Sequence, residues 1–194
     1  MTRLRLRDLA EDDRDLLLRW RNAGDVREAS FTDREVTREE HDRWFDRSLG
    51  LAPPFRQVVV WQGAPVGVLQ LGEGGPGEAT YRWGCHLGER DAVPRGIGGA
   101  LPALVMSVAF ARLDARRVVG EVLATNEVML GILERRGVRR EGVLREAVLR
   151  RDSTPCDVHL FAVLRHEWAD LRARTLIRTP PGLRAHVEAC FDAI

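Results

Sequence analysis

A glycine-rich segment at residues 94–101 carries the clearest chemical signal in the sequence. It reads Pro-Arg-Gly-Ile-Gly-Gly-Ala-Leu and leads into a long apolar run. Glycines let a backbone turn sharply, so that several N–H groups at the positive end of a following helix can face one anion. Arg95 adds a positive charge to the same segment. We therefore expect a loop that binds a diphosphate, and the alternative is a glycine-rich turn without a ligand.

Composition excludes several other kinds of chemistry. The 194 residues hold 30 basic and 29 acidic side chains, a net charge of +1 that favours neither nucleic acid nor an anionic membrane. Every basic residue is arginine, so Schiff bases and a Walker P-loop, which needs Gly-Lys-Ser/Thr, are excluded. The three cysteines form no CxxC pair and the five histidines no HExxH motif, so we expect no disulfide framework and no metal centre. The start of the chain lacks the apolar core of a signal peptide, which favours a cytoplasmic globular domain.

The elements that must position the loop follow from hydrophobic periodicity. Period-two patterns predict strands at 2–9, 55–61, 65–71, 79–87, 118–123, 142–150 and 157–164. Helical patterns occupy 11–22, 37–45, 98–113, 126–136 and 166–174, and a short amphipathic tail follows residues 179–182. We expect Gly84 to form a bulge, and Pro102 to be tolerated because it falls in the first turn of its helix. This order predicts an α+β (mixed α/β) fold with a largely antiparallel sheet.

Several short motifs occur in the order typical of one enzyme family. They are residues 18–22, 25–27, 39–41, 83–84, 87–88, 109–110, 121–123, 126–127, 134–137, 141–146, 157–158 and 167–168. With the loop at 93–100, this set resembles the GCN5-related N-acetyltransferases (GNAT). It is most similar to the branch that holds ribosomal-protein N-terminal acetyltransferases and the amino-sugar nucleotide N-acetyltransferases of pseudaminic acid biosynthesis. The resemblance assigns residues 1–168 to the acyltransferase domain and leaves 169–194 as a C-terminal helical extension, for packing or for a homodimer contact.

The resemblance implies that the fourth and fifth strands, residues 79–87 and 117–123, splay apart and admit the pantetheine arm of acetyl-CoA. It places the following residues at this co-substrate: Cys85, Leu87, Arg95, Gly96, Ile97, Gly98, Gly99, Ala100 and Asn126. An amine would enter from the other side and attack the thioester carbonyl directly, with backbone N–H groups near Cys85 and His86 holding the oxyanion. For Asn126, capping of the next helix is an equally good role.

Two side chains are candidates for the general base. Glu121 stands alone in an apolar strand beside the implied slot, where it could act through water; the alternative is an ion pair with an arginine on a neighbouring strand. His86 stands where relatives often have tyrosine, and the alternative for it is ordinary packing within the strand. Both alternatives stay open at the level of sequence.

Three positions depart from the family pattern. Leu133 stands where relatives commonly have the tyrosine that protonates the CoA thiolate, and leucine donates nothing. Tyr81, the only tyrosine, is a substitute candidate, although an aromatic residue on a strand is more often a core residue. Arg82 replaces a carboxylate beside the substrate, which suits an acidic or phosphorylated acceptor.

The early helices are expected to wall the acceptor pocket. Trp20 and Phe31 could stack on a sugar or base, while Arg21 and Asn22 could bind a phosphate or another polar group. We therefore expect acetyl transfer to a primary amine of a small molecule such as an amino sugar or a nucleotide-linked amino sugar. The alternatives are a protein N-terminus as acceptor, a non-catalytic CoA-binding protein, and another acyl-CoA reaction such as decarboxylation.

Overall fold

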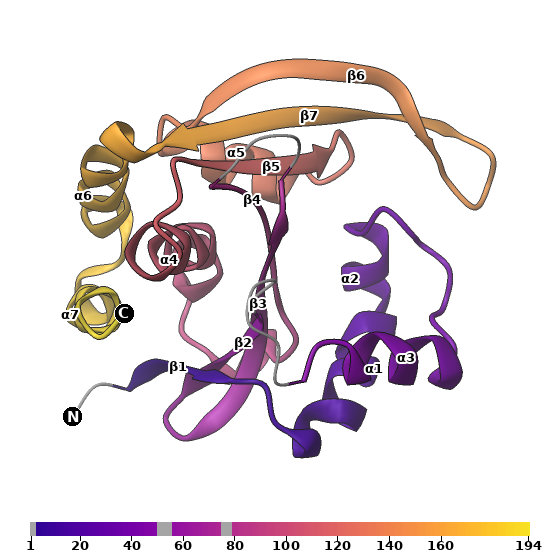
Figure 1. Ribbon diagram of the computed structural model, residues 1–194, viewed down its shortest axis with the longest axis horizontal. Coiled ribbons are helices and arrows are strands. Elements are labelled where there is room, and N and C mark those ends of the chain that lie inside the picture. Colours follow the sequence, from indigo (N-terminus) through magenta and orange to yellow (C-terminus); the bar gives the residue numbers. More distant parts are fainter. Residues whose placement is uncertain (1–2, 50–55, 75–78) are drawn as a thin grey trace.

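The computed structural model describes residues 3–49, 56–74 and 79–194, and these contain one seven-stranded sheet in the order β1-β2-β3-β4-β5-β7-β6 (Figure 1). The strands are β1 (Leu4–Asp8), β2 (Arg56–Trp61), β3 (Ala64–Glu73), β4 (Thr80–Leu87), β5 (Arg117–Leu123), β6 (Arg139–Leu149) and β7 (Pro155–Leu164). The helices are α1 (Arg14–Asn22), α2 (Gly24–Glu28), α3 (Arg38–Asp46), α4 (Ile97–Arg112), α5 (Glu127–Arg135), α6 (Trp168–Arg178) and α7 (Pro181–Asp192). Only β4 and β5 pair in parallel. The expected α+β fold is therefore confirmed.

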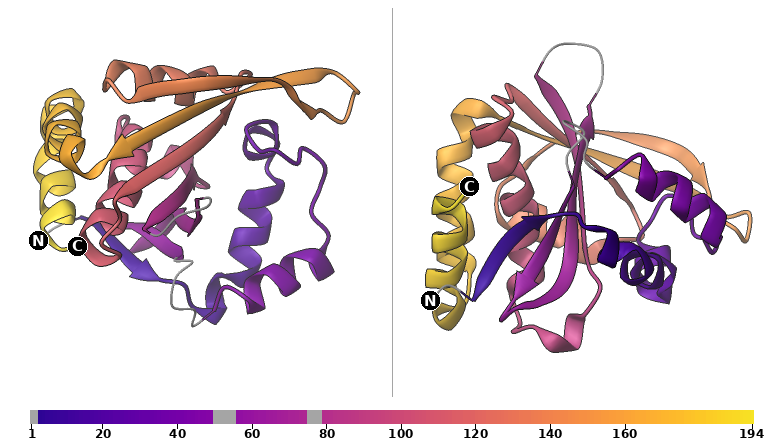
Figure 2. Two further views of the ribbon diagram at one scale, coloured as in Figure 1. Left: turned by 45° about the horizontal axis from the view of Figure 1, so that its top comes forward. Right: turned by 60° about the horizontal axis from the view of Figure 1, so that its bottom comes forward.

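Helices cover both faces of the sheet, as Figures 1 and 2 show. Helices α4, α6 and α7 lie on one face, and α1, α2 and α3 lie on the other. Helix α4 is the centre of the core: nearly all of its residues from Ile97 to Phe110 are buried. Alternation along β4 sends Tyr81, Trp83 and Cys85 into the α4 core and leaves Arg82 and His86 for the opposite face.

Strands β4 and β5 separate after three residue pairs. Thr80, Tyr81 and Arg82 pair with residues 117–119, whereas the rest of β4 pairs with β3 alone. Beyond that point β5 pairs only with β7. The two strands therefore part beyond Arg82 and Val119, as the family resemblance implies, and the slot is the region between residues 83–87 of β4 and 120–123 of β5.

The indole of Trp83 lies at the base of this slot. A Cβ atom at Gly120 would collide with the indole nitrogen and lie 2.6 Å from Cε2, so only glycine fits at this position of β5. Trp83 is 8% exposed, and its Nε1 has no hydrogen-bond partner among the described residues. The bulky side chain of Trp83 on β4 therefore packs over Gly120 of β5 at the point where the two strands part.

Several helix ends and one turn follow directly from the residues that form them. Thr37 caps α3 in a capping box with Glu40, Asn126 caps α5, and Gly137 ends it with a φ of 68°. The β2–β3 hairpin turns at Gln62 and Gly63, both at positive φ, as a two-residue turn requires.

Other local predictions were wrong. Pro102 is the sixth residue of α4 and lies beyond the first turn, so the carbonyl of Gly98 lacks its usual helical donor. Gly84 forms no bulge: it pairs with Gln70 in unbroken register, and a Cβ there would meet the Gln70 side chain. Helix α2 was not predicted, and α6 continues to Arg178. Thr2 and Phe55, the first residues of the strands predicted at 2–9 and 55–61, lie outside the described residues.

Candidate active site

The glycine-rich loop begins α4, as predicted. Gly96 is the N-cap residue at a φ of 108°, a conformation that favours glycine, and no side chain caps the helix. The N–H groups of the first helical turn have no partner within the helix. A 16-residue helix with an uncapped, glycine-rich start fits the phosphates of a cofactor, and Arg95 lies exposed beside it.

Each glycine of the loop also allows a close approach by another element. A Cβ at Gly98 would lie 3.1 Å from Leu87 Cδ1 on β4, and one at Gly96 would lie 2.7 Å from Pro180 Cδ in the α6–α7 linker. A Cβ at Gly99 would lie 2.9 Å from Nη2 of Arg136. The start of α4 is thus enclosed by β4, α5 and the C-terminal helices.

Cys85 and Leu87 belong to the part of β4 that does not pair with β5, so the structure brings both to the slot. Burial raises the pKa of the Cys85 thiol to about 12. A thiol that stays protonated at neutral pH is a poor nucleophile, which favours direct transfer over an acyl-enzyme. Asn126 stands at the head of α5, where its Oδ1 accepts from the N–H of Met129 at 3.1 Å. Its capping role is therefore confirmed, and its contact with pantetheine stays a prediction.

The opposite face of the slot carries an ion pair. Arg82 Nη2 lies 2.9 Å from Glu121 Oε1, and these side chains come from β4 and β5. The ion-pair interpretation of Glu121 is thus confirmed, and the base role stays a prediction.

His86 lies on the same face as Arg82, four residues further along β4. Its ring meets Trp20 edge-on at 6.5 Å, and its Nε2 is buried with no partner among the described residues. Burial, followed by the charge of Arg21, lowers the pKa of His86 to about 4. The imidazole is therefore neutral at physiological pH.

The predicted acceptor residues divide into two groups. Trp20 is 2% exposed, packs on Gly88 and donates from Nε1 to Glu89 at 2.9 Å, so it belongs to the helix-on-sheet core. Asn22 exchanges two 2.9 Å hydrogen bonds with the backbone of Val36 and fixes the linker before α3. Phe31, by contrast, is exposed in the α2–α3 linker.

Arg21 keeps an unused donor group. Its Nη2 donates to the Thr32 carbonyl at 2.7 Å, while Nη1 is buried without a partner among the described residues. Burial, then repulsion from Arg27 and Arg34, lowers the pKa of Arg21. Several positive charges therefore share this side of the slot.

The two positions considered for a general acid, Leu133 and Tyr81, both lie on the α4 side of the sheet, whereas His86 lies on the other side. Leu133 is completely buried and packs in the α4 core. Tyr81 lies in the paired part of β4 and packs against the same core. The structure does not bring Tyr81 together with Arg82 or His86.

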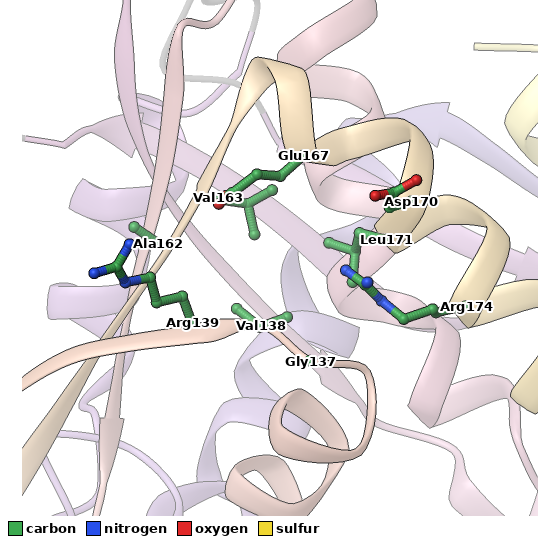
Figure 3. A pocket seen from close by; sticks show the side chains of 9 residues that line it. All are labelled: Gly137, Val138, Arg139, Ala162, Val163, Glu167, Asp170, Leu171 and Arg174. Atoms are coloured by element: carbon green, nitrogen blue, oxygen red, sulfur yellow. The ribbon is translucent and has the colours of Figure 1, made fainter.

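A cavity of about 270 Å³ lies away from these residues, between the β6–β7 strands and α6 (Figure 3). Its lining includes Gly137, Arg139, Asp170 and Arg174. None of the residues predicted for the active site lines it. In the part of the chain described, no group of three or more His, Cys, Asp or Glu side chains could hold a metal ion. No helix within the described ranges is long and apolar enough to cross a bilayer.

The family model of the acetyltransferase (GNAT) domain matches residues 3–139, and the chain therefore belongs to this family. It is an acetyl-CoA-dependent N-acetyltransferase. Binding of the CoA diphosphate by its glycine-rich loop stays a prediction. No curated protein matches the sequence.

Solved structures share the fold at low sequence identity. A spermidine N-acetyltransferase from Vibrio cholerae, in complex with CoA and spermine, is 18% identical and has a TM-score of 0.77. The match covers 87% of this chain and 99% of that chain. An N-acetyltransferase from Staphylococcus aureus Mu50 is 18% identical with a TM-score of 0.69, covering 84% and 98%. A GNAT-family acetyltransferase from Bacillus anthracis is 18% identical with a TM-score of 0.70, covering 85% and 96%.

The contact between Arg136 and Gly99 was not predicted from the sequence. Nothing in the pattern separates it from the other arginines, and Gly99, which it meets, lies 37 positions earlier in the chain.

Proposed function

We propose that this enzyme acetylates a primary amine of a small molecule that also carries a negatively charged group, such as an amino sugar phosphate or a nucleotide-linked amino sugar. The observation that carries the proposal is the buried, unpartnered Nη1 of Arg21 among the described residues of the acceptor side. A guanidinium with an unused donor and no carboxylate partner suits a phosphate or carboxylate of the substrate.

Neighbouring arginines support an anionic acceptor. Arg27 Nε is also buried without a partner in the described part of the chain, and its nearest carboxylate contact is Glu35 at 3.7 Å. Arg34 is already held by Glu40. A polyamine such as spermidine carries cationic groups and offers no anion to the unpartnered donors of Arg21 and Arg27, which disfavours it although a spermidine N-acetyltransferase shares the fold.

In the proposed reaction, the neutral amine attacks the thioester carbonyl, the carbon–sulfur bond breaks, and CoA leaves as its thiolate. Glu121 accepts the amine proton through water, and the N–H groups near Cys85 and His86 donate to the developing oxyanion. Water protonates the thiolate, because Leu133 supplies no proton.

Release of free CoA thiol in the presence of matched amines tests the proposal. The panel compares an amino sugar, its phosphate, its nucleotide-linked form, spermidine and an N-terminal peptide. We expect the phosphate-bearing amines to have the highest kcat/KM, by about tenfold or more over the uncharged sugar, which is the effect of one charge-assisted contact.

A variant separates charge recognition from catalysis. Arg21→Gln should remove the preference for phosphate while preserving turnover of the uncharged amine, and Arg165→Gln, on the other side of the sheet, is the matched control. Fastest turnover with spermidine would contradict an anionic acceptor. Tight CoA binding without release of thiol from any amine would favour a non-catalytic role, and a peptide as best acceptor would favour N-terminal acetylation.

A further inference from the structure

Arg136, the residue that follows α5, is a buried arginine whose side chain reaches the start of α4. It is 6% exposed, and its Nη2 lies 2.9 Å from where a Cβ of Gly99 would be. Nη1 makes a long 3.3 Å hydrogen bond to the Ile132 carbonyl, and Nε is buried with no partner among the described residues. The side chain is thus enclosed, directed at the first turn of α4 and incompletely bonded.

No carboxylate within the described residues lies within ion-pairing distance of Arg136. Burial, followed by repulsion from Arg135 and Arg178, lowers its pKa. A buried charge without a counter-ion is costly, and buried charges in proteins are normally paired. The described surroundings of Arg136 therefore provide no counter-ion, and an anionic ligand can supply one.

The C-terminal helices reach the same place. The linker residue Pro180 packs on Gly96, and Leu183 of α7 lies 3.7 Å from the same Cβ position. Arg178, the last residue of α6, is close enough to Arg136 to influence its charge. The ends of α5 and α6 thus bring arginines to the first turn of α4.

We propose that Arg136, assisted by Arg135 and Arg178, binds a phosphate group of CoA at the start of α4, and that the C-terminal helices are therefore part of the co-substrate site. The ligand's identity rests on the acetyl transfer described above. The diphosphate and the 3′-phosphate share the required chemistry, and the experiment separates them.

Calorimetry of CoA binding, without any acceptor amine, tests the proposal independently of the proposed substrate. We expect Arg136→Met to raise the dissociation constant of CoA by about 10- to 100-fold and Arg178→Met by about threefold to tenfold, since each loses a charge-assisted contact. Arg43→Met, exposed on α3 across the sheet, should change nothing.

Three ligands locate the contact. If Arg136→Met weakens CoA and 3′-dephospho-CoA equally, Arg136 binds the diphosphate; if 3′-dephospho-CoA is spared, it binds the 3′-phosphate. Pantetheine, which carries no phosphate, should bind wild type and variant alike. An equal loss with pantetheine, or unchanged CoA binding in both arginine variants, would overturn the proposal.

Thermal unfolding distinguishes a ligand-binding role from a structural one. Because an unpaired buried charge is being replaced by an apolar side chain, Arg136→Met without ligand should melt at the wild-type temperature or above it. The stabilisation that CoA adds should shrink in the variant. A melting temperature well below wild type, with CoA stabilisation unchanged, would show that Arg136 serves the fold alone.

Discussion

Arg82 and Glu121 join β4 to β5 at the point where the two strands part, with 2.9 Å between Nη2 and Oε1. Arg82 is the last residue of β4 that pairs with β5, and Glu121 lies two residues beyond its partner Val119. The pair thus holds a carboxylate on the face of the sheet that His86 also occupies. Since both side chains are partly exposed, we expect the pair to matter more for positioning than for stability.

Glu121→Gln should lower kcat/KM by about 10²- to 10⁴-fold, because the amide cannot take a proton from the amine. The shape of the pH profile of kcat/KM should also change in this variant. Arg82→Gln should lower kcat/KM less, because it releases the carboxylate without removing it. An unchanged pH profile in Glu121→Gln would remove Glu121 from the reaction.

Gly120→Ala should destabilise the protein by about 1–3 kcal/mol, because the new methyl group overlaps the Trp83 indole. Urea unfolding measures the difference. Gly72→Ala is the matched control, since a Cβ there meets nothing within 4 Å. Equal stability of the two variants would show that Trp83 moves aside without cost.

His86 should make the fold less stable in mild acid. Its folded pKa is lowered to about 4 by burial and then by Arg21, against about 6.5 in the unfolded chain, so the unfolded state binds more protons between these values. Its contribution is complete above about pH 6.5 and is lost as the pH falls towards 4.

Unfolding of His86→Phe at pH 7 and pH 5 measures that contribution. The wild type should lose about 2 kcal/mol more than the variant over this interval. Asp25 and Arg90 also act on His86, in opposite directions, so single substitutions there provide a check on the electrostatic part. Parallel losses in wild type and His86→Phe would contradict the prediction.

Tyr81→Phe should change kcat by less than about threefold, because Tyr81 packs against the α4 core in the paired part of β4. A steady-state assay with acetyl-CoA decides this. A loss of about 10²-fold would restore Tyr81 as the acid that protonates the thiolate.

Much of the fold follows from periodicity. The alternation in β4 and the apolar run of α4 predicted both elements, and Thr37 marked the start of α3. Helix α2 was missed because five residues carry too little periodicity. Pro102 lies beyond the first turn whether α4 is started at Gly98, as predicted, or at Ile97, as observed, so the predicted helix itself already placed the proline in its second turn.

The candidate site was predictable only where one segment carries it. The loop at the start of α4 lies within one short segment, so the sequence alone predicted its place before the helix. The ion pair of Glu121 was one of two open interpretations, because strand register decides which arginine lies opposite. The enclosure of Trp20 by Gly88 and Glu89 depends on packing between distant segments, which no local pattern contains.

The burial of the cysteines has a practical consequence. Cys156 and Cys190 are buried, and burial raises the thiol pKa values of Cys85 and Cys190 to about 12 and about 11. Thiolates are the form that attacks chromogenic disulfides, so the native enzyme should give little background colour in a continuous assay. Colour that develops with acetyl-CoA and an amine then reports turnover directly, and a slow rise without substrate reports unfolding of the enzyme.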